Sequence, residues 1–133
     1  MRRILIADDD PGILDAMEML LSRDYLVATA RDGEEALDSL RREPADLVIL
    51  DLWMPLLDGE SALTRMREEG SRLPVIVMSA QADRLGKPRM LGADDFLPKP
   101  FEFGELERMI EKLLGPESRR GDVARDPGPS PHL

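Results

Sequence analysis

Five short apolar runs alternate with segments of helical spacing over the first 114 residues of the chain. Three of the runs are continuously apolar, a pattern typical of strands buried on both faces of a parallel sheet. Repeated strand–helix alternation predicts a doubly wound α/β domain with a five-stranded parallel sheet and right-handed crossovers. The runs are Ile4–Ala7, Tyr25–Ala30, Asp46–Leu50, Pro74–Met78 and Asp95–Leu97.

The segments between the runs carry the residue types that begin and end helices. Asp10 and Pro11 suit the cap and the first position of one helix, and Asp58 suits the cap of another. The DGEE sequence at positions 32–35 has the spacing of a capping box. A last helix is predicted over Phe103–Leu114, where a glycine and a proline follow.

The segment between the fourth and fifth runs is the weak part of this pattern. Gly86, Pro88 and Gly92 interrupt it, and little helical periodicity remains. Because glycine and proline disfavour a helix interior, the sequence predicts a shortened or irregular fourth helix that starts near Pro88.

Length and composition favour one domain followed by a tail. Residues 1–114 contain all the predicted elements and are enough for one hydrophobic core. Residues 115–133 hold four prolines and three glycines among scattered charges, and are expected to be a disordered tail or a linker. The chain has no cysteine, which excludes thiolate metal sites and fits a reducing, cytoplasmic setting.

The charge distribution argues against two classes of partner. The formal net charge is −9, and three arginines balance three acids in residues 115–133, so the acidic excess lies in residues 1–114. This disfavours direct binding of the domain to nucleic acid or to an anionic membrane. No apolar run approaches the roughly 20 residues that a membrane-spanning helix needs.

Chemistry-bearing side chains stand directly after four of the predicted strands. Asp8 and Asp9 follow the first strand and Asp51 the third. Ser79 follows the fourth strand, and Lys99 follows the fifth. Because the carboxyl ends of parallel strands share one edge of the sheet, these groups would converge if the first and third strands are neighbours.

The predicted cluster has the equipment for phosphoryl transfer. Carboxylates at close quarters repel one another and favour a hard cation, Mg²⁺ or Mn²⁺. Lys99 would add an ammonium group and Ser79 a hydroxyl, so a metal and a lysine could neutralise phosphoryl oxygens. The only histidine is His132 in the tail, so a carboxylate is the remaining nucleophile and would form an acyl phosphate.

Four segments of the sequence resemble, in order, the signatures of the receiver domains of bacterial two-component response regulators, of the chemotaxis-regulator type. Each motif alone is moderately specific, whereas all four in this order are very specific. The resemblance covers residues 1–114 and implies a flavodoxin-like fold with strand order 2-1-3-4-5. The segments are ILIADDDP at 4–11, LVILDLWMP at 47–55 with the following Asp58-Gly59, PVIVMSA at 74–80 and GADDFLPKPF at 92–101.

The resemblance implies a role for each residue of the acidic cluster. Asp51 matches the phosphoacceptor. Asp9 matches the direct metal ligand, and Asp8 matches an acid that acts on the metal mainly through water. The backbone carbonyl of Trp53 matches the third protein ligand of the metal.

Other matched positions imply binding and switching of the phosphoryl group. Lys99, Ser79 and Ala80 match phosphoryl-binding residues. Ser79 also matches the switch hydroxyl, whose aromatic counterpart is Phe96. The bond between Lys99 and Pro100 is expected to be cis.

The implied function is that of a cytoplasmic, Mg²⁺-dependent phosphoacceptor in phosphorelay signalling. Such a domain is not an enzyme acting on other substrates, because it catalyses only its own phosphorylation and slow dephosphorylation. The implied donor is a histidine kinase or a histidine phosphotransfer protein. The output would be an effector domain after the tail or a separate output protein.

Three other functions compete with this interpretation. An aspartyl-phosphate phosphohydrolase usually needs an acid two positions after its nucleophile, where this chain has Trp53. A flavodoxin-like cofactor binder is disfavoured because aspartates after the first strand would repel an FMN phosphate. A phosphorylation-independent interaction module is disfavoured by the presence of Asp51, Asp9 and Lys99. A purely structural ion-pair cluster would leave two buried acids with one lysine.

Several residues near the predicted site also have ordinary structural interpretations. Asp10 and Asp58 suit helix caps better than metal ligands. Leu14, Leu56 and Leu57 fit two roles equally well: packing in the core, or apolar contact with a kinase helix near the site.

Overall fold

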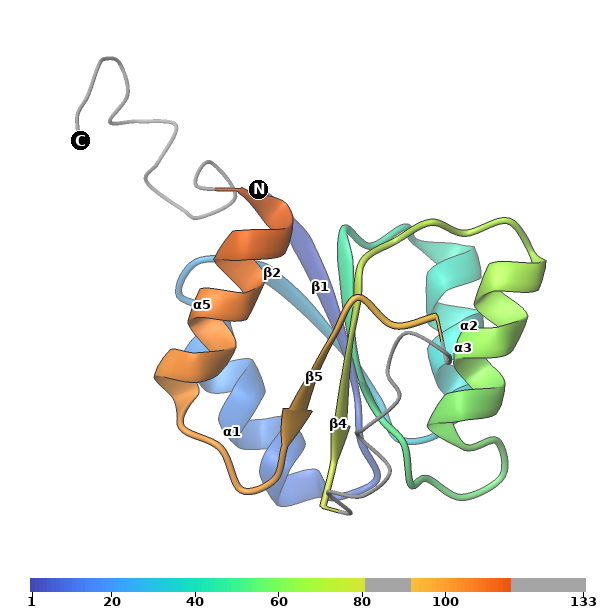
Figure 1. Cartoon of the computed structure of the whole chain (residues 1–133), viewed down its shortest axis with the longest axis horizontal. Coiled ribbons are helices and arrows are strands. Elements are labelled where there is room, and N and C mark those ends of the chain that lie inside the picture. The colour runs from blue at the N-terminus through green and yellow to red at the C-terminus, as the bar shows by residue number, and fades with distance from the viewer. Residues whose placement is uncertain (81–91, 116–133) are drawn as a thin grey trace.

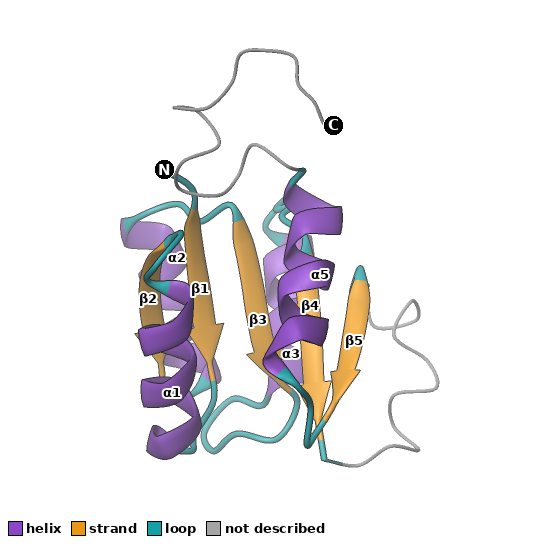
Figure 2. Ribbon diagram, turned by 90° about the vertical axis from the view of Figure 1, so that its left-hand side faces the viewer, coloured by secondary structure: helices purple, strands orange, loops and turns teal. Residues whose placement is uncertain are grey.

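The structure, a computed structural model, describes residues 1–80 and 92–115. Over these residues five parallel strands form one sheet in the order β2-β1-β3-β4-β5, which confirms the predicted topology (Figure 2). The strands are β1 (Arg3–Ala7), β2 (Leu26–Ala30), β3 (Leu47–Asp51), β4 (Val75–Ser79) and β5 (Asp95–Pro98).

Helices cover both faces of the sheet. Helices α1 and α5 lie on one face, and α2 and α3 lie on the other (Figure 1). The predicted fourth helix falls within residues 81–91 and the predicted tail begins at 115, so both lie outside the described residues apart from Gly115. The helices are α1 (Pro11–Leu21), α2 (Gly33–Arg42), α3 (Gly59–Glu68) and α5 (Phe103–Leu114).

The continuous apolar runs are explained by two cores, one on each face of the sheet. Along β1, Ile4 and Ile6 pack with α1 and α5, whereas Leu5 and Ala7 pack with α2 and α3. Both sets are at most 1% exposed. A strand covered on both faces gains from apolar residues at every position, so period-two alternation is lost. Within the described residues, no helix combines the length and apolar character needed to cross a membrane.

An aspartate side chain caps the N-terminus of each of the first three helices, as predicted. The carboxylate of Asp10 accepts from two backbone N–H groups of α1, and that of Asp58 accepts from one of α3. Asp32 accepts from the N–H of Glu35 at 2.8 Å. The capping-box prediction is wrong in its second half, because the Glu35 carboxylate accepts from the N–H of Arg31 at 2.7 Å. That N–H lies one residue before the cap, and the extended backbone brings it within reach.

Gly59 stands where the first turn of α3 crosses the end of β3. Its N–H donates to the carbonyl oxygen of Leu52 at 3.0 Å. A Cβ at this position would overlap the carbonyl oxygen of Asp51 and lie 2.8 Å from Cα of Leu52. Only glycine lets α3 begin this close to Asp51 without a shift of the backbone.

We expect Gly59→Ala to lower the free energy of unfolding by about 3 kcal/mol, because overpacking against backbone cannot be relieved by a rotamer change. Urea denaturation measures this. The matched control is Gly104→Ala in α5, where an added Cβ meets only the end of the Arg108 side chain at 3.4 Å. Alanine is the better helix former, so the control should be unchanged or slightly more stable. Equal stability of the two variants would contradict the prediction.

Candidate functional site

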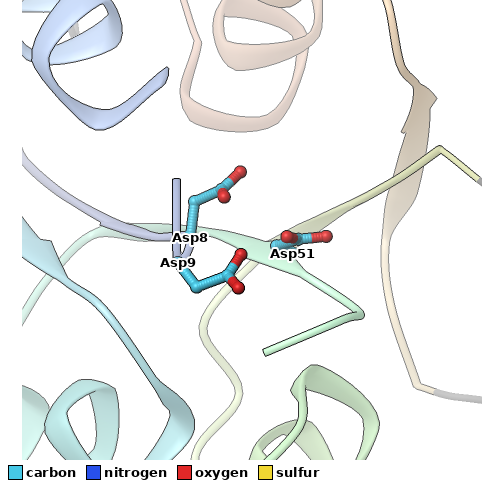
Figure 3. A group of neighbouring side chains, drawn as sticks. All are labelled: Asp8, Asp9 and Asp51. Carbon is cyan, nitrogen blue, oxygen red and sulfur yellow. The ribbon is translucent and has the colours of Figure 1, made fainter. Parts of the chain in front are cut away.

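Three carboxylates meet at the edge of the sheet where the strands end (Figure 3). Asp51 is the last residue of β3, and Asp8 and Asp9 directly follow β1. The two strands are neighbours in parallel register, so their ends coincide. One oxygen atom of each carboxylate lies within 4.8 Å of those of the other two. Asp8 and Asp51 are 0% and 4% exposed, whereas Asp9 is exposed.

Backbone N–H groups hold the two buried carboxylates in place. The N–H of Asp8 donates to the carbonyl of Ala30 at 3.0 Å, which extends the pairing of β1 with β2 by one residue. Oδ1 of Asp8 accepts from the N–H of Asp10 at 2.9 Å, and Oδ1 of Asp51 accepts from the N–H of Trp53 at 3.3 Å. The sequence does not reveal these backbone donors, since any residue except proline supplies an N–H.

Lys99 brings one positive charge to the cluster from the end of β5. Its Nζ lies 2.7 Å from Oδ2 of Asp8 and 3.4 Å from Oδ2 of Asp51. The backbone N–H of Lys99 donates to the carbonyl of Ser79 at 2.8 Å, which fixes the lysine one residue beyond the strand. The bond between Lys99 and Pro100 is cis. In this structure the ammonium is closer to Asp8 than to Asp51.

The cluster carries more negative than positive charge. Burial, and then the charge of Asp8, raise the pKa of Asp51 from 3.8 to about 6, although Lys99 acts in the opposite direction. Burial lowers the pKa of Lys99, but its hydrogen bond to Asp8 and the charge of Asp51 outweigh burial, so the pKa is raised. Lys99 is therefore protonated near neutral pH, and one ammonium group faces three carboxylates.

The donor set fits a hard divalent cation. All three side chains offer oxygen atoms, the ligand type that Mg²⁺ and Mn²⁺ prefer. Two of the carboxylates are buried with a single lysine between them, so a cation would offset charge that the protein itself leaves uncompensated.

The family model for the response regulator receiver domain matches residues 4–111. This chain belongs to the receiver domain family of response regulators. It is a signalling domain, and its flavodoxin-like sheet order is the one that the sequence predicted.

Relatives of this receiver domain include two curated regulators. The response regulator GtcR of Aneurinibacillus migulanus is 45% identical over 118 residues, which are 85% of this chain and 48% of GtcR. The transcriptional regulatory protein PrrA of Mycobacterium tuberculosis is 41% identical over 126 residues, which are 92% of this chain and 52% of PrrA. The chain thus spans about half the length of these relatives.

The fold of this chain is similar to that of a solved response regulator structure. It is the response regulator TrrA of Thermotoga maritima in complex with Mg²⁺–BeF. It superimposes with a TM-score of 0.78 and 34% sequence identity, over 86% of this chain and 100% of TrrA.

The remaining matched residues of the receiver domain lie on the two strands beyond Asp51 or directly after one of them. Ser79 ends β4 and is fully buried, and the exposed Ala80 follows it. Phe96 lies on β5 in register with Val77 and packs, half-buried, against the core beneath α2 and α3. The structure thus places Ser79 and Phe96 on adjacent strands of the same sheet.

The structure shows different degrees of burial for three leucines whose roles the sequence left open. Leu14 is 5% exposed and packs in the core between α1 and the sheet. Leu57 is half-buried against the opposite core. Leu56 is 85% exposed, and its φ of 67° lies in the left-handed region. A core role is therefore correct for Leu14 and wrong for Leu56.

Proposed function

We propose that this receiver domain is a Mg²⁺-dependent phosphoacceptor in two-component signalling. Asp51 would take a phosphoryl group from a phosphohistidine of a histidine kinase or a histidine phosphotransfer protein. The observation that supports this best is a buried Asp51 carboxylate beside the Lys99 ammonium within a cluster of three carboxylates. A cytoplasmic location would follow from such a donor.

In the proposed transfer, a carboxylate oxygen of Asp51 attacks the phosphorus atom. A P–O bond forms as the P–N bond to the donor imidazole breaks, and the imidazole nitrogen keeps the electron pair and takes up a proton. Asp51 must be ionised to attack, and Lys99 would contribute its positive charge to the oxygens of the transferred group. The backbone beyond Ser79, at Ala80, would provide a further donor.

The cation would be held by Asp8, Asp9, Asp51 and the backbone carbonyl of Trp53. When bound, it would offset the negative charge of the phosphoryl oxygens and of the carboxylates. The oxygen-only donor set supports this assignment, as does the likeness to TrrA, whose structure contains Mg²⁺–BeF. Slow loss of the phosphoryl group to water would use the same residues.

Phosphorylation would act by shifting an equilibrium between two conformations of the domain. The hydroxyl of Ser79, buried at the end of β4 beside β3, is the proposed first contact. Phe96 on the adjacent β5 would change its packing together with Ser79. The relatives are about twice as long as this chain, which supports an effector domain as the output, joined through residues 115–133, or otherwise a separate output protein.

Acetyl phosphate tests the proposed acceptor chemistry without any partner protein. Intact mass spectrometry should show one phosphoryl adduct that requires both Mg²⁺ and Asp51. Asp51→Asn should give no adduct, because an amide cannot form the acyl phosphate, whereas the control Asp38→Asn on the exposed side of α2 should label normally.

An adduct that persists in Asp51→Asn or forms equally in EDTA would contradict the proposed site. If the wild-type chain neither labels nor responds to beryllofluoride, the phosphorylation-independent interaction module becomes the better interpretation.

A further inference from the structure

A cavity of about 420 Å³ lies between α1 and the start of α5. Both helices cover the same face of the sheet (Figure 2). The walls of the cavity are largely apolar, and its lining includes Ile13, Ala16, Leu20, Phe101 and Phe103. A hollow of this size and character can accept a large apolar side chain from another molecule.

Next to this cavity, α1 carries an exposed apolar side chain. Met19 is 68% exposed, so it gains little from folding against the described residues. It follows Ala16 by three positions, which places the two side chains next to each other on the outer side of the helix. A methionine side chain is flexible and fits irregular apolar hollows. Helix α1 therefore bears both a hollow and a side chain that could fill the same hollow on another copy of the chain.

The charged residues on either side of Met19 make the outer side of α1 complementary to itself. Asp15 precedes Met19 by four positions, and Arg23 follows it by four, in the turn after the helix. Both charged residues are exposed, and within residues 1–80 and 92–115 neither takes part in an ion pair. Side chains four positions apart lie along one side of a helix. An antiparallel copy of this row would therefore place an acid opposite each base.

We infer that the outer side of α1 binds a second copy of this chain in a symmetric dimer. The two α1 helices would run antiparallel about a two-fold axis near Met19. Each Met19 would enter between Ala16 and Leu20 of the other copy and reach the cavity behind them. Asp15 of each copy would pair with Arg23 of the other. A two-fold interface uses the same surface twice, so it needs a surface that is complementary to itself, as this one is.

The size and position of this contact set the conditions for testing it. One helix and one cavity from each copy bury less surface than a permanent dimer does, so the association should be reversible and depend on concentration. Lys99 and Ala80 also line the cavity. The interface would therefore adjoin residues that are proposed to bind the phosphoryl group. Measurements made without Mg²⁺ or any phosphodonor do not depend on that proposed function.

Sedimentation velocity of the full chain tests the contact. The weight-average mass of wild type should rise toward twice the monomer mass as the concentration approaches about 1 mM. Met19→Lys should raise the dissociation constant by about tenfold or more, because it would place an ammonium group in an apolar cavity. The control Leu26→Lys introduces the same charge at another exposed apolar side chain, on β2, and should associate like wild type. Both replaced side chains are exposed, so both variants should melt near the wild-type temperature.

Exchanging the two charges tests the antiparallel arrangement. In Asp15→Arg alone two bases would meet at each contact, and in Arg23→Asp alone two acids would meet, so each variant should remain a monomer. An equimolar mixture of the two variants should associate again, because each contact then joins an acid to a base. A loss of folding cannot produce this result, since each variant would associate only with the other.

Three outcomes overturn the inference. A wild-type chain that stays monomeric at every concentration leaves the cavity to a partner of another kind. A dimer that persists in Met19→Lys is held together by a different surface. A mixture of Asp15→Arg and Arg23→Asp that does not associate rules out the antiparallel pairing of the two helices.

Discussion

Lys99→Met should lower the free energy of unfolding of the metal-free domain by about 3–5 kcal/mol near pH 8, the usual cost of removing one partner of a buried ion pair. The side chain of Lys99 is 17% exposed, and its ammonium lies 2.7 Å from the buried Asp8 and 3.4 Å from the buried Asp51. Methionine fills a similar volume, so the loss reports the missing charge and not a cavity. Urea denaturation in EDTA measures the effect.

The dependence on pH and Mg²⁺ identifies the cause of this loss. Near pH 5 the deficit should shrink, because Asp51, with its pKa already raised by burial and by Asp8, takes up a proton. Saturating Mg²⁺ should also recover part of the stability, since it supplies the missing positive charge. The control is Lys112→Met on the exposed side of α5. If both variants are equally stable under all conditions, the ammonium does not support the buried carboxylates.

Asp51→Asn, in contrast to Lys99→Met, should raise the free energy of unfolding of the metal-free domain. Above pH 7 the gain should be up to about 3 kcal/mol, the free-energy equivalent of the pKa difference between 3.8 and about 6. The wild-type carboxylate is harder to ionise in the folded chain than in the unfolded chain. The amide keeps an oxygen for the N–H of Trp53 but carries no charge to repel Asp8.

The direction of the pH dependence follows from the number of protons that the folded and unfolded chains bind at Asp51. Between about pH 4 and pH 6 the folded wild-type chain binds more protons at Asp51 than the unfolded chain, so this group's contribution to stability falls as the pH rises. The difference between Asp51→Asn and wild type should therefore be near zero at pH 4, grow through pH 6 and then level off. A difference that is constant with pH would contradict the assigned cause.

Mg²⁺ should reverse the order of stability of wild type and Asp51→Asn. It should stabilise wild type more than Asp51→Asn, because the amide is a weaker ligand than the carboxylate. Asp38→Asn, an exposed acid on α2, should show neither the pH dependence nor the reversal. The carboxylate cluster thus lowers the stability of the metal-free domain, and a cation or a change of charge at Asp51 would offset this loss.

Local sequence pattern predicts the strands, most helix ends and the edge of the sheet at which the carboxylates and Lys99 gather. Continuous apolar runs mark strands buried on both faces, because each position then faces a helix layer. Asp8, Asp9, Asp51 and Lys99 converge because each stands at the end of a strand or just past it, and parallel strands end at one edge. The strands and helix ends follow from local pattern, whereas the strand order that makes β1 and β3 neighbours was implied by the resemblance to receiver domains.

The surroundings of each side chain follow from the packing of the folded domain. The apolar residues Leu14, Leu56 and Leu57 have the same character in sequence, but their surroundings make one core, one exposed and one half-buried. Lys99 pairs more closely with Asp8 than with Asp51, a difference set by side-chain geometry across three strands. Burial and long-range contacts depend on residues far apart in the chain, so no local pattern could predict them.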